Sequence, residues 1–210
     1  MVVGRLAGAM KEFADVRKSH LQLLRRLGQL VPLNAEQQEN LCAVVKAKRY
    51  EKGDCLLDRD AVSDKIFFVV EGILRSACDA DGKEITRWFC FPNHFATAYF
   101  SFVYRQPSED CISAVTTTHT LSLSYVDLQQ LSQQDAVWID LNRRLLEYHY
   151  TTLLDRVMSF QSQSAKERYH RLLISQPDIE EQVPLGYLAS FLGMSQETLS
   201  RLRAKYKAKP

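Results

Sequence analysis

The stretch that decides the fold class is residues 51–91, "EKGDCLLDRDAVSDKIFFVVEGILRSACDADGKEITRWFCF". It consists of short apolar runs separated by glycine-containing turns, and the run "IFFVV" is rich in the β-branched and aromatic residues that favour strands. Asp81-Gly82 lies between two alternating runs and predicts a two-residue hairpin. Residues 112–125, "ISAVTTTHTLSLSY", are equally β-rich. We therefore predict an antiparallel β-roll, or jelly roll, over residues 49–126.

The amino-acid composition changes after the roll. Residues 127–175 contain neither glycine nor proline, and we predict a long helix over residues 127–162. Apolar residues recur on this helix in two stripes at spacings of three and four. The first stripe consists of Trp138, Leu141, Leu145 and Tyr148. The second stripe consists of Leu146, Tyr150, Leu153, Val157 and Phe160. One stripe is expected to pack on the roll and the other on the same helix of a second chain, which makes this the dimerisation helix of a homodimer. The alternative is a helix wrapped entirely by its own domain.

Helices are also expected on both flanks of this core. Residues 1–48 predict N-terminal helices, one of which has Asn34 as a suitable N-cap. The acidic stretch 175–183 predicts a linker, and residues 163–210 predict a C-terminal domain. The fold class is therefore α+β: an antiparallel β-roll with flanking helices, a long helix and a helical C-terminal domain.

The C-terminal domain contains "LGYLASFLGMSQETLSRLR", residues 185–203. A first short helix is expected over residues 185–192, and Gly193 is expected to end it because glycine tolerates positive φ. Ser195 is a suitable N-cap for a second helix, and small Ala189 lies where the two helices would cross. Leucines and a methionine occupy the inward positions, namely Leu188, Leu192, Met194, Leu199 and Leu202. This pattern predicts a helix-turn-helix.

The second helix then presents polar and basic side chains outward. Such side chains can reach base edges and phosphates in the major groove of double-stranded DNA. The candidate DNA-binding residues are Ser195, Gln196, Glu197, Ser200, Arg201, Arg203 and Lys205. Residues 201–209 contain five basic residues and no acidic one, which favours phosphate attraction. The alternatives are a helical hairpin with a charged face and a solvated chain end.

Other classes of protein are disfavoured. The formal net charge of +2 says little about partners. No stretch approaches the roughly 18 apolar residues that span a bilayer, and no signal peptide is recognisable. We expect a cytoplasmic protein without a membrane partner. The five cysteines include no CxxC pair, which argues against a disulfide framework, an iron–sulfur cluster and a zinc site. No nucleophile-elbow, HExxH or P-loop pattern occurs, and the roll holds only His94 and His119 as histidines, so we expect no catalytic residues, metal or cofactor.

The motifs resemble, in their order along the chain, the Crp/Fnr superfamily of bacterial transcription regulators. Residues 52–89 are similar to that family's cyclic-nucleotide-binding-type roll, with a strand, Glu-Gly and a hairpin. Residues 195–203, "SQETLSRLR", resemble its recognition helix. The resemblance implies a homodimer joined by the long helix. It also implies that four residues of the second helix face DNA bases, namely Gln196, Glu197, Ser200 and Arg201.

The resemblance weakens at the phosphate-binding cassette. The corresponding residues 91–115 contain no glycine, and Arg105 precedes Glu109, which reverses the family's order. Asp110-Cys111 stands where an arginine and a small residue are expected, and an aspartate there would repel a phosphate. We predict that the protein does not bind cyclic AMP in the usual way. Either the pocket is filled, or it takes an unknown small-molecule effector that is flatter or more apolar, contacted by His94, Tyr99 and Arg105.

Few residues follow the recognition helix, so the β-hairpin wing of such regulators is expected to be reduced or absent. The function predicted from sequence is a DNA-binding transcriptional regulator. The rival hypothesis is a β-roll sensor or scaffold that binds another protein rather than DNA.

Overall fold

The computed structural model of the protein describes the backbone of residues 2–207 and the side chains of residues 15–206. The described strands form two four-stranded sheets in which every pairing is antiparallel. The first sheet has the order β1 (Lys46–Tyr50), β8 (Thr118–Ser124), β3 (Lys65–Glu71) and β6 (Phe95–Ala96). The second has the order β2 (Cys55–Leu57), β7 (Asp110–Ala114), β4 (Leu74–Ala80) and β5 (Lys83–Cys90). The predicted antiparallel roll is confirmed, and its first strand begins three residues before the expected boundary.

Two turns of the roll depend on local backbone chemistry. Asp81 and Gly82 both have positive φ and join β4 to β5, as a two-residue hairpin of mirror-image type requires. The Asp79 carboxylate accepts a hydrogen bond from the Gly82 amide at 2.9 Å. Gly72, at φ +89°, joins β3 to β4, and a Cβ there would lie 2.5 Å from the Thr117 carbonyl oxygen. No other residue fits this turn without moving the backbone.

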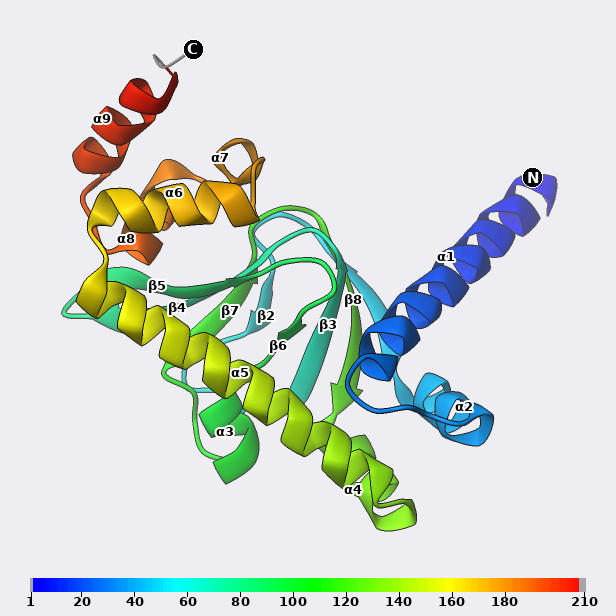
Figure 1. Ribbon diagram of the computed structural model, residues 1–210. Helices are drawn as coiled ribbons and strands as arrows, with labels where there is room; N and C mark the ends of the chain where they lie inside the picture. Colours follow the sequence, from blue (N-terminus) through cyan, green and yellow to red (C-terminus); the bar gives the residue numbers. More distant parts are fainter. Residues whose placement is uncertain (1, 208–210) are drawn as a thin grey trace.

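Helices cover the roll at both ends of the chain (Figure 1). The long helix α1 (Val2–Gly28) projects from the roll, with its C-terminal end next to the roll, and α2 (Ala35–Val44) begins with Asn34 as its N-cap in a capping box. After the roll, α4 (Tyr125–Gln134) and α5 (Val137–Ser162) follow. Figure 1 shows α5 running across the strands from α4 to the C-terminal helices.

The structure divides the helix predicted over residues 127–162 into these two helices. Asp135 adopts an extended conformation, and its carboxylate accepts a hydrogen bond from the Val137 amide at 2.9 Å. The same carboxylate accepts a bond from Gln37 of α2 at 2.6 Å. A residue that favours caps over helix interiors therefore interrupts the helix, although neither glycine nor proline is present.

The two stripes on α5 meet opposite environments. In the first stripe, Trp138 and Leu141 are 1% and 5% exposed and pack with Phe68 and Leu121 of the roll. The second stripe is exposed along its whole length: Leu146 41%, Tyr150 58%, Leu153 58%, Val157 45% and Phe160 41%. Within one chain, the described elements leave every member of the second stripe at least 41% exposed.

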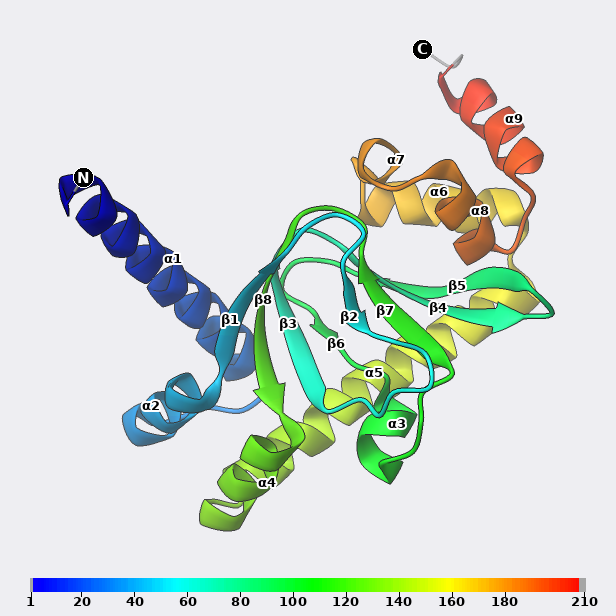
Figure 2. The ribbon, with the colours of Figure 1, turned by 180° about the vertical axis from the view of Figure 1, so that it is seen from behind.

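The C-terminal domain consists of α6 (Ala165–Ser175), α7 (Ile179–Gln182), α8 (Leu185–Leu192) and α9 (Gln196–Lys207). The stretch expected as a linker contains α7, whose Ile179 is 2% exposed and belongs to the domain core. Between β8 and Lys207 the structure contains no strand, so the described part of this domain has no β-hairpin wing. In the view from behind, α9 is the outermost element of this end (Figure 2). No described helix is both long and apolar enough to cross a membrane.

Candidate nucleic-acid interface

The turn between α8 and α9 is tight and is built around Gly193. Gly193 has φ +67°, and its amide donates to the Ser190 carbonyl at 3.2 Å. The Met194 amide donates to the Ala189 carbonyl at 3.0 Å. This pair of bonds forms a Schellman motif, which satisfies the last carbonyls of α8 and turns the chain sharply. Helix α8 covers the residues predicted for the first helix, from Leu185 to Leu192.

The start of α9 is capped as predicted. The Ser195 hydroxyl accepts a hydrogen bond from the Thr198 amide at 3.2 Å. A hydrogen bond with Ser195 also lowers the pKa of the exposed Glu197 carboxyl, so the first turn of α9 carries a negative charge at neutral pH. The predicted inward residues form the domain core: Leu188, Ala189, Leu192 and Leu199 are at most 3% exposed, and Met194 and Leu202 pack against them.

Most of the candidate DNA-binding residues are exposed, and one of them forms an ion pair within the C-terminal domain. The exposed candidates are Ser195, Gln196, Glu197, Ser200, Arg201 and Lys205. Arg203 instead pairs with Glu180 of α7, with 2.8 Å between its Nε and the carboxylate oxygen. That carboxylate also accepts a hydrogen bond from the buried Tyr169 hydroxyl. Burial, together with this bond, raises the pKa of Tyr169, so the phenol stays protonated. Arg203 therefore ties α9 to α6 and α7 rather than pointing to solvent.

The C-terminal domain is docked on the roll through α8. The Ser190 hydroxyl of α8 accepts a hydrogen bond from the Thr86 amide of β5 at 2.9 Å. The Arg75 guanidinium, on β4, stacks on the Tyr187 ring at 3.7 Å and donates to Thr86 and Glu84. These contacts involve residues of α8, β4 and β5 and none of α9. The docking therefore does not engage the exposed residues of α9.

Two arginines and a phenylalanine of α5 and α6 contact the turn between α8 and α9. Arg168 of α6 donates two hydrogen bonds to the Leu192 carbonyl at 3.0 and 3.1 Å. Arg156 of α5 donates to the Phe191 carbonyl at 3.2 Å. The Phe160 ring, also on α5, lies 2.7 Å from the position that a Cβ on Gly193 would occupy. The orientation of α9 is thus fixed through contacts to α5 and α6.

The interior of the roll is filled by side chains. Val69, Leu74 and Ile112 are completely buried there, and Tyr50 and Phe67 meet edge to face with 6.5 Å between ring centroids. Trp88 packs against the same cluster. A packed interior of this kind resembles a domain core rather than a ligand site.

The three candidate effector residues lie in separate surroundings. Arg105 has φ +56° at the end of α3 (Tyr99–Tyr104), donates to the Ser63 carbonyl at 2.6 Å and stacks on Tyr125. The His94 ring stacks on Tyr148 of α5, with 6.3 Å between centroids. Tyr99 is half-buried, and burial raises its pKa. No hydrogen bond or ring contact among the described side chains joins the three residues.

Asp110 is held inside the fold by an arginine. The Arg87 Nε lies 3.0 Å from the Asp110 carboxylate, and the Asp110 side chain is 13% exposed. Burial raises the pKa of Asp110, although the charge of Arg87 opposes that rise. Arg87 also reaches Glu109 at 3.2 Å. Residues 109–110 therefore present carboxylates that already have a cation as their partner.

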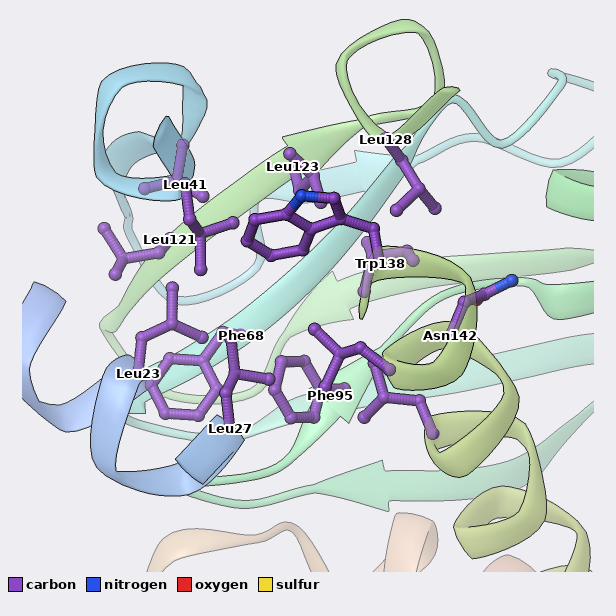
Figure 3. A pocket seen from close by; sticks show the side chains of 14 residues that line it. Leu23, Leu27, Leu41, Phe68, Phe95, Leu121, Leu123, Leu128, Trp138 and Asn142 are labelled. Carbon is purple, nitrogen blue, oxygen red and sulfur yellow. The ribbon is translucent and has the colours of Figure 1, made fainter. Parts of the chain in front are cut away.

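A small cavity lies between the first sheet and the helices, outside the roll interior (Figure 3). Its volume is about 40 Å³, and Leu and Phe side chains surround Trp138 there, with Asn142 as the polar exception. Ligand pockets typically measure roughly 300–1,000 Å³, so this cavity is too small for a nucleotide. Among the described residues, no cluster of three histidine, cysteine, aspartate or glutamate side chains could hold a metal ion.

Comparison with known families agrees with this architecture. The profile of the cyclic nucleotide-binding domain family matches residues 47–135. None of the curated proteins matches the chain in sequence.

Solved structures extend the likeness beyond these residues to most of the chain. FixK2 from Bradyrhizobium japonicum has a TM-score of 0.65 at 17% identity, and the match covers 79% of this chain and 86% of FixK2. A transcriptional regulator of the Crp/Fnr family from Eubacterium rectale has a TM-score of 0.66 at 17% identity, covering 84% of this chain and 85% of that one. The c-di-GMP-responsive global regulator CLP of Xanthomonas campestris has a TM-score of 0.61 at 19% identity, covering 83% of this chain and 92% of CLP. The predicted resemblance to the Crp/Fnr superfamily is confirmed at the level of fold.

Proposed function

We propose that the protein is a homodimeric transcriptional regulator that binds double-stranded DNA through α9. The observation that carries the proposal is the polar face of α9, where Gln196, Glu197, Ser200 and Arg201 are all exposed while Leu199 on the opposite face is completely buried. A helix anchored in this way can enter a major groove without losing its packing. Arg201 is suited to donate two hydrogen bonds to a guanine, and Lys205 to contact a phosphate.

The homodimer is proposed from the exposed stripe on α5. Its members follow one another at spacings of four, three, four and three residues, which is the heptad pattern of a two-stranded coiled coil. A second copy of α5 presents the same stripe, so the interface is self-complementary about a two-fold axis. The two α9 helices would then meet successive major grooves, about 34 Å apart, on a near-palindromic site.

The proposal does not include cyclic AMP as the effector. Side chains fill the roll interior, and Asp110 and Glu109 already engage Arg87, a cation that could otherwise attract a cyclic phosphate. We expect isothermal titration with cyclic AMP at millimolar concentration to give no binding heat. A dissociation constant in the micromolar range would contradict this part of the proposal.

DNA binding can be tested by fluorescence anisotropy with sheared bacterial genomic fragments at low ionic strength. We expect saturable binding that Arg201→Ala weakens and that Arg49→Ala leaves unchanged. Arg49 is a matched control because it is an exposed arginine on β1, paired with Glu51 at 3.0 Å. Wild-type protein that binds no fragment, but retains a second protein from its cell extract, would favour the scaffold function instead.

A further inference from the structure

A second cavity lies between the second sheet and the start of α8. Its volume is about 300 Å³, at the lower end of the range of ligand pockets. Pro184 and Tyr187 line it on the side of the C-terminal domain. On the side of the roll, its lining includes two cysteines, Cys55 of β2 and Cys111 of β7. Cys55 is exposed and Cys111 is half-buried, so both thiols can be reached from solvent.

The strand register places both thiols on the same face of the sheet. Strands β2 and β7 lie side by side (Figure 2), and Cys55 is directly opposite Ser113. Residues that pair across strands share a face, and so do residues two apart on one strand, so Cys111 shares the face of Ser113. Ile112 points the other way and is completely buried in the roll interior. The Cys55 thiol donates a weak hydrogen bond to the Ile112 carbonyl at 3.7 Å, which brings its sulfur next to Cys111.

The spacing of the two cysteines suits a bridging ion rather than a disulfide. The Cα atoms of such diagonal neighbours lie roughly 7–8 Å apart, whereas a disulfide joins Cα atoms that are roughly 4.4–6.8 Å apart. An ion held between two sulfurs lengthens the bridge. Structural zinc sites take four ligands, but no cluster of three suitable side chains exists among the described residues. A soft cation that accepts two thiolates fits this ligand set, and Cu(I) is the soft cation that thiolates select.

The charges around the cavity fit a complex of one Cu(I) and two thiolates, which carries one negative charge. Lys52 lines the cavity, and its ammonium has no carboxylate partner among the described side chains. The buried Arg75 also lines the cavity, but it is paired with Glu84 at 2.9 Å and adds no net charge. Lys52 is therefore the cation that is available to an anionic complex.

The thiols are protonated before an ion binds. Partial burial and a hydrogen bond with Asp58 raise the pKa of Cys55 to about 11, with a smaller contribution from the charge of Cys111. That contribution is a second sign that the two sulfurs are close to each other. Binding of a metal ion to thiols of this kind releases their protons to solvent.

We propose that Cys55 and Cys111 form a binding site for one Cu(I) ion in the cavity between the roll and α8. Each thiol loses its proton and donates its sulfur to the ion, so one Cu(I) replaces two protons and no electron is transferred. The Lys52 ammonium offsets the remaining negative charge. This site goes beyond the proposed function, because it uses no residue of α9 and does not depend on DNA.

Competition with the chelator bicinchoninate under anaerobic conditions tests the site, with Cu(I) as the probe. We expect each wild-type chain to withdraw one Cu(I) from the chelator. Cys55→Ser and Cys111→Ser should each weaken the affinity at least 100-fold. The matched control is Cys42→Ser, because Cys42 is a half-buried cysteine of α2 that does not line the cavity, and it should change the affinity less than twofold. Circular dichroism shows whether the variants are folded. A folded Cys55→Ser or Cys111→Ser variant with wild-type affinity would overturn the proposal.

Two measurements on variants that keep both cysteines distinguish a paired site from a single thiol. Release of two protons should raise the affinity on the order of 100-fold from pH 6 to pH 7, after correction for the titration of the chelator. Lys52→Met should weaken binding about three- to tenfold, whereas Lys46→Met, on an exposed lysine of β1 outside the cavity, should leave it unchanged. A rise of tenfold or less, or equal effects of the two lysines, would contradict the assignment.

Oxidation separates the ion site from a disulfide. We expect hydrogen peroxide, without metal, to leave Cys55 and Cys111 unlinked in peptide mass spectrometry. A peptide pair that joins the two cysteines, with the loss of two hydrogens, would show that the sulfurs bond directly. That result would contradict the spacing on which the proposal rests.

Discussion

The interior of the β-roll and the outer face of α9 differ in whether their side chains are already packed and paired or remain exposed to solvent. In the roll, Val69, Leu74 and Ile112 are completely buried, and Arg87 already neutralises the carboxylate of Asp110. On α9, the polar groups of Gln196, Ser200 and Arg201 face solvent. The contrast teaches that the polar side chains on the outer face of α9 remain available for a partner, whereas packing and an ion pair already engage those residues of the roll.

Removing the dimer should have the largest effect on DNA binding, because both α9 helices must act together. Leu153→Arg places a charge in the exposed stripe, and we expect a monomer in sedimentation equilibrium. Losing the second half-site should weaken DNA binding about 100-fold or more in fluorescence anisotropy. The matched control is Arg171→Ala, on an exposed residue paired with Asp155 outside the stripe. A monomeric Leu153→Arg variant with wild-type DNA affinity would show that α9 acts alone.

Two arginines of α9 differ in the same way, because Arg201 is exposed and Arg203 is paired with Glu180. Arg201→Ala should cost about 1–3 kcal/mol of binding free energy at the preferred site, and less on random DNA, while the melting temperature stays unchanged. Arg203→Ala should instead lower the melting temperature, because it leaves the partly buried Glu180 carboxylate without its cation. Anisotropy titrations and thermal melts of both variants separate the two effects. If Arg203→Ala weakened DNA binding and Arg201→Ala lowered the melting temperature, the DNA-binding face of α9 would be misidentified.

The turn that supports α9 should be sensitive to one methyl group. Gly193→Ala forces alanine to φ +67° and brings its Cβ against the Phe160 ring. We expect a loss of about 1–2 kcal/mol in the free energy of unfolding, measured by urea denaturation. Gly28→Ala is the control, because nothing lies within 4 Å of a Cβ at that position. Similar losses for both variants would argue against the close approach at Gly193.

The smallest expected effect concerns the filled roll. Since folding raises the pKa of Asp110, its ionisation costs more in the folded than in the unfolded protein. Its contribution to stability therefore falls as the pH rises from the unfolded pKa, near 4, through the raised folded pKa. Asp110→Asn removes this loss, so the variant should gain stability relative to wild type between pH 4 and pH 7. Urea unfolding at both pH values measures this, and a relative loss at pH 7 would mean that the Arg87 ion pair outweighs burial.

The sequence predicted those parts of the structure that local chemistry determines. Asp81-Gly82 predicted the hairpin, and Gly193 with Ser195 predicted the turn and cap of the C-terminal helices, because φ preferences and caps act over a few residues. The two stripes on α5 were equally visible, because periodicity does not require knowledge of the partner. The break at Asp135 was missed, since neither glycine nor proline marks it and one of its hydrogen bonds comes from Gln37, which is far away in the sequence.

The candidate site was predictable only in part for the same reason. The exposed face of α9 follows from helical spacing, but the ion pair of Arg203 with Glu180 depends on how α7 folds back on α9. Similarly, nothing local indicates that Phe160 meets Gly193 or that Arg105 reaches the Ser63 carbonyl. His94, Tyr99 and Arg105 were grouped by proximity in the sequence, whereas in the fold His94 stacks on Tyr148 and Arg105 stacks on Tyr125.

Selection of bound DNA from a random-sequence pool tests the central claim most directly. If α9 of each subunit occupies a major groove across a two-fold axis, the selected sites should share an inverted repeat. The centres of its half-sites should lie about one helical turn, or 10 base pairs, apart, and Arg201→Ala should relax the preference within each half-site. A pool that shows no enrichment at low ionic strength, or that yields a single unsymmetric motif which Arg201→Ala leaves unchanged, would contradict the account.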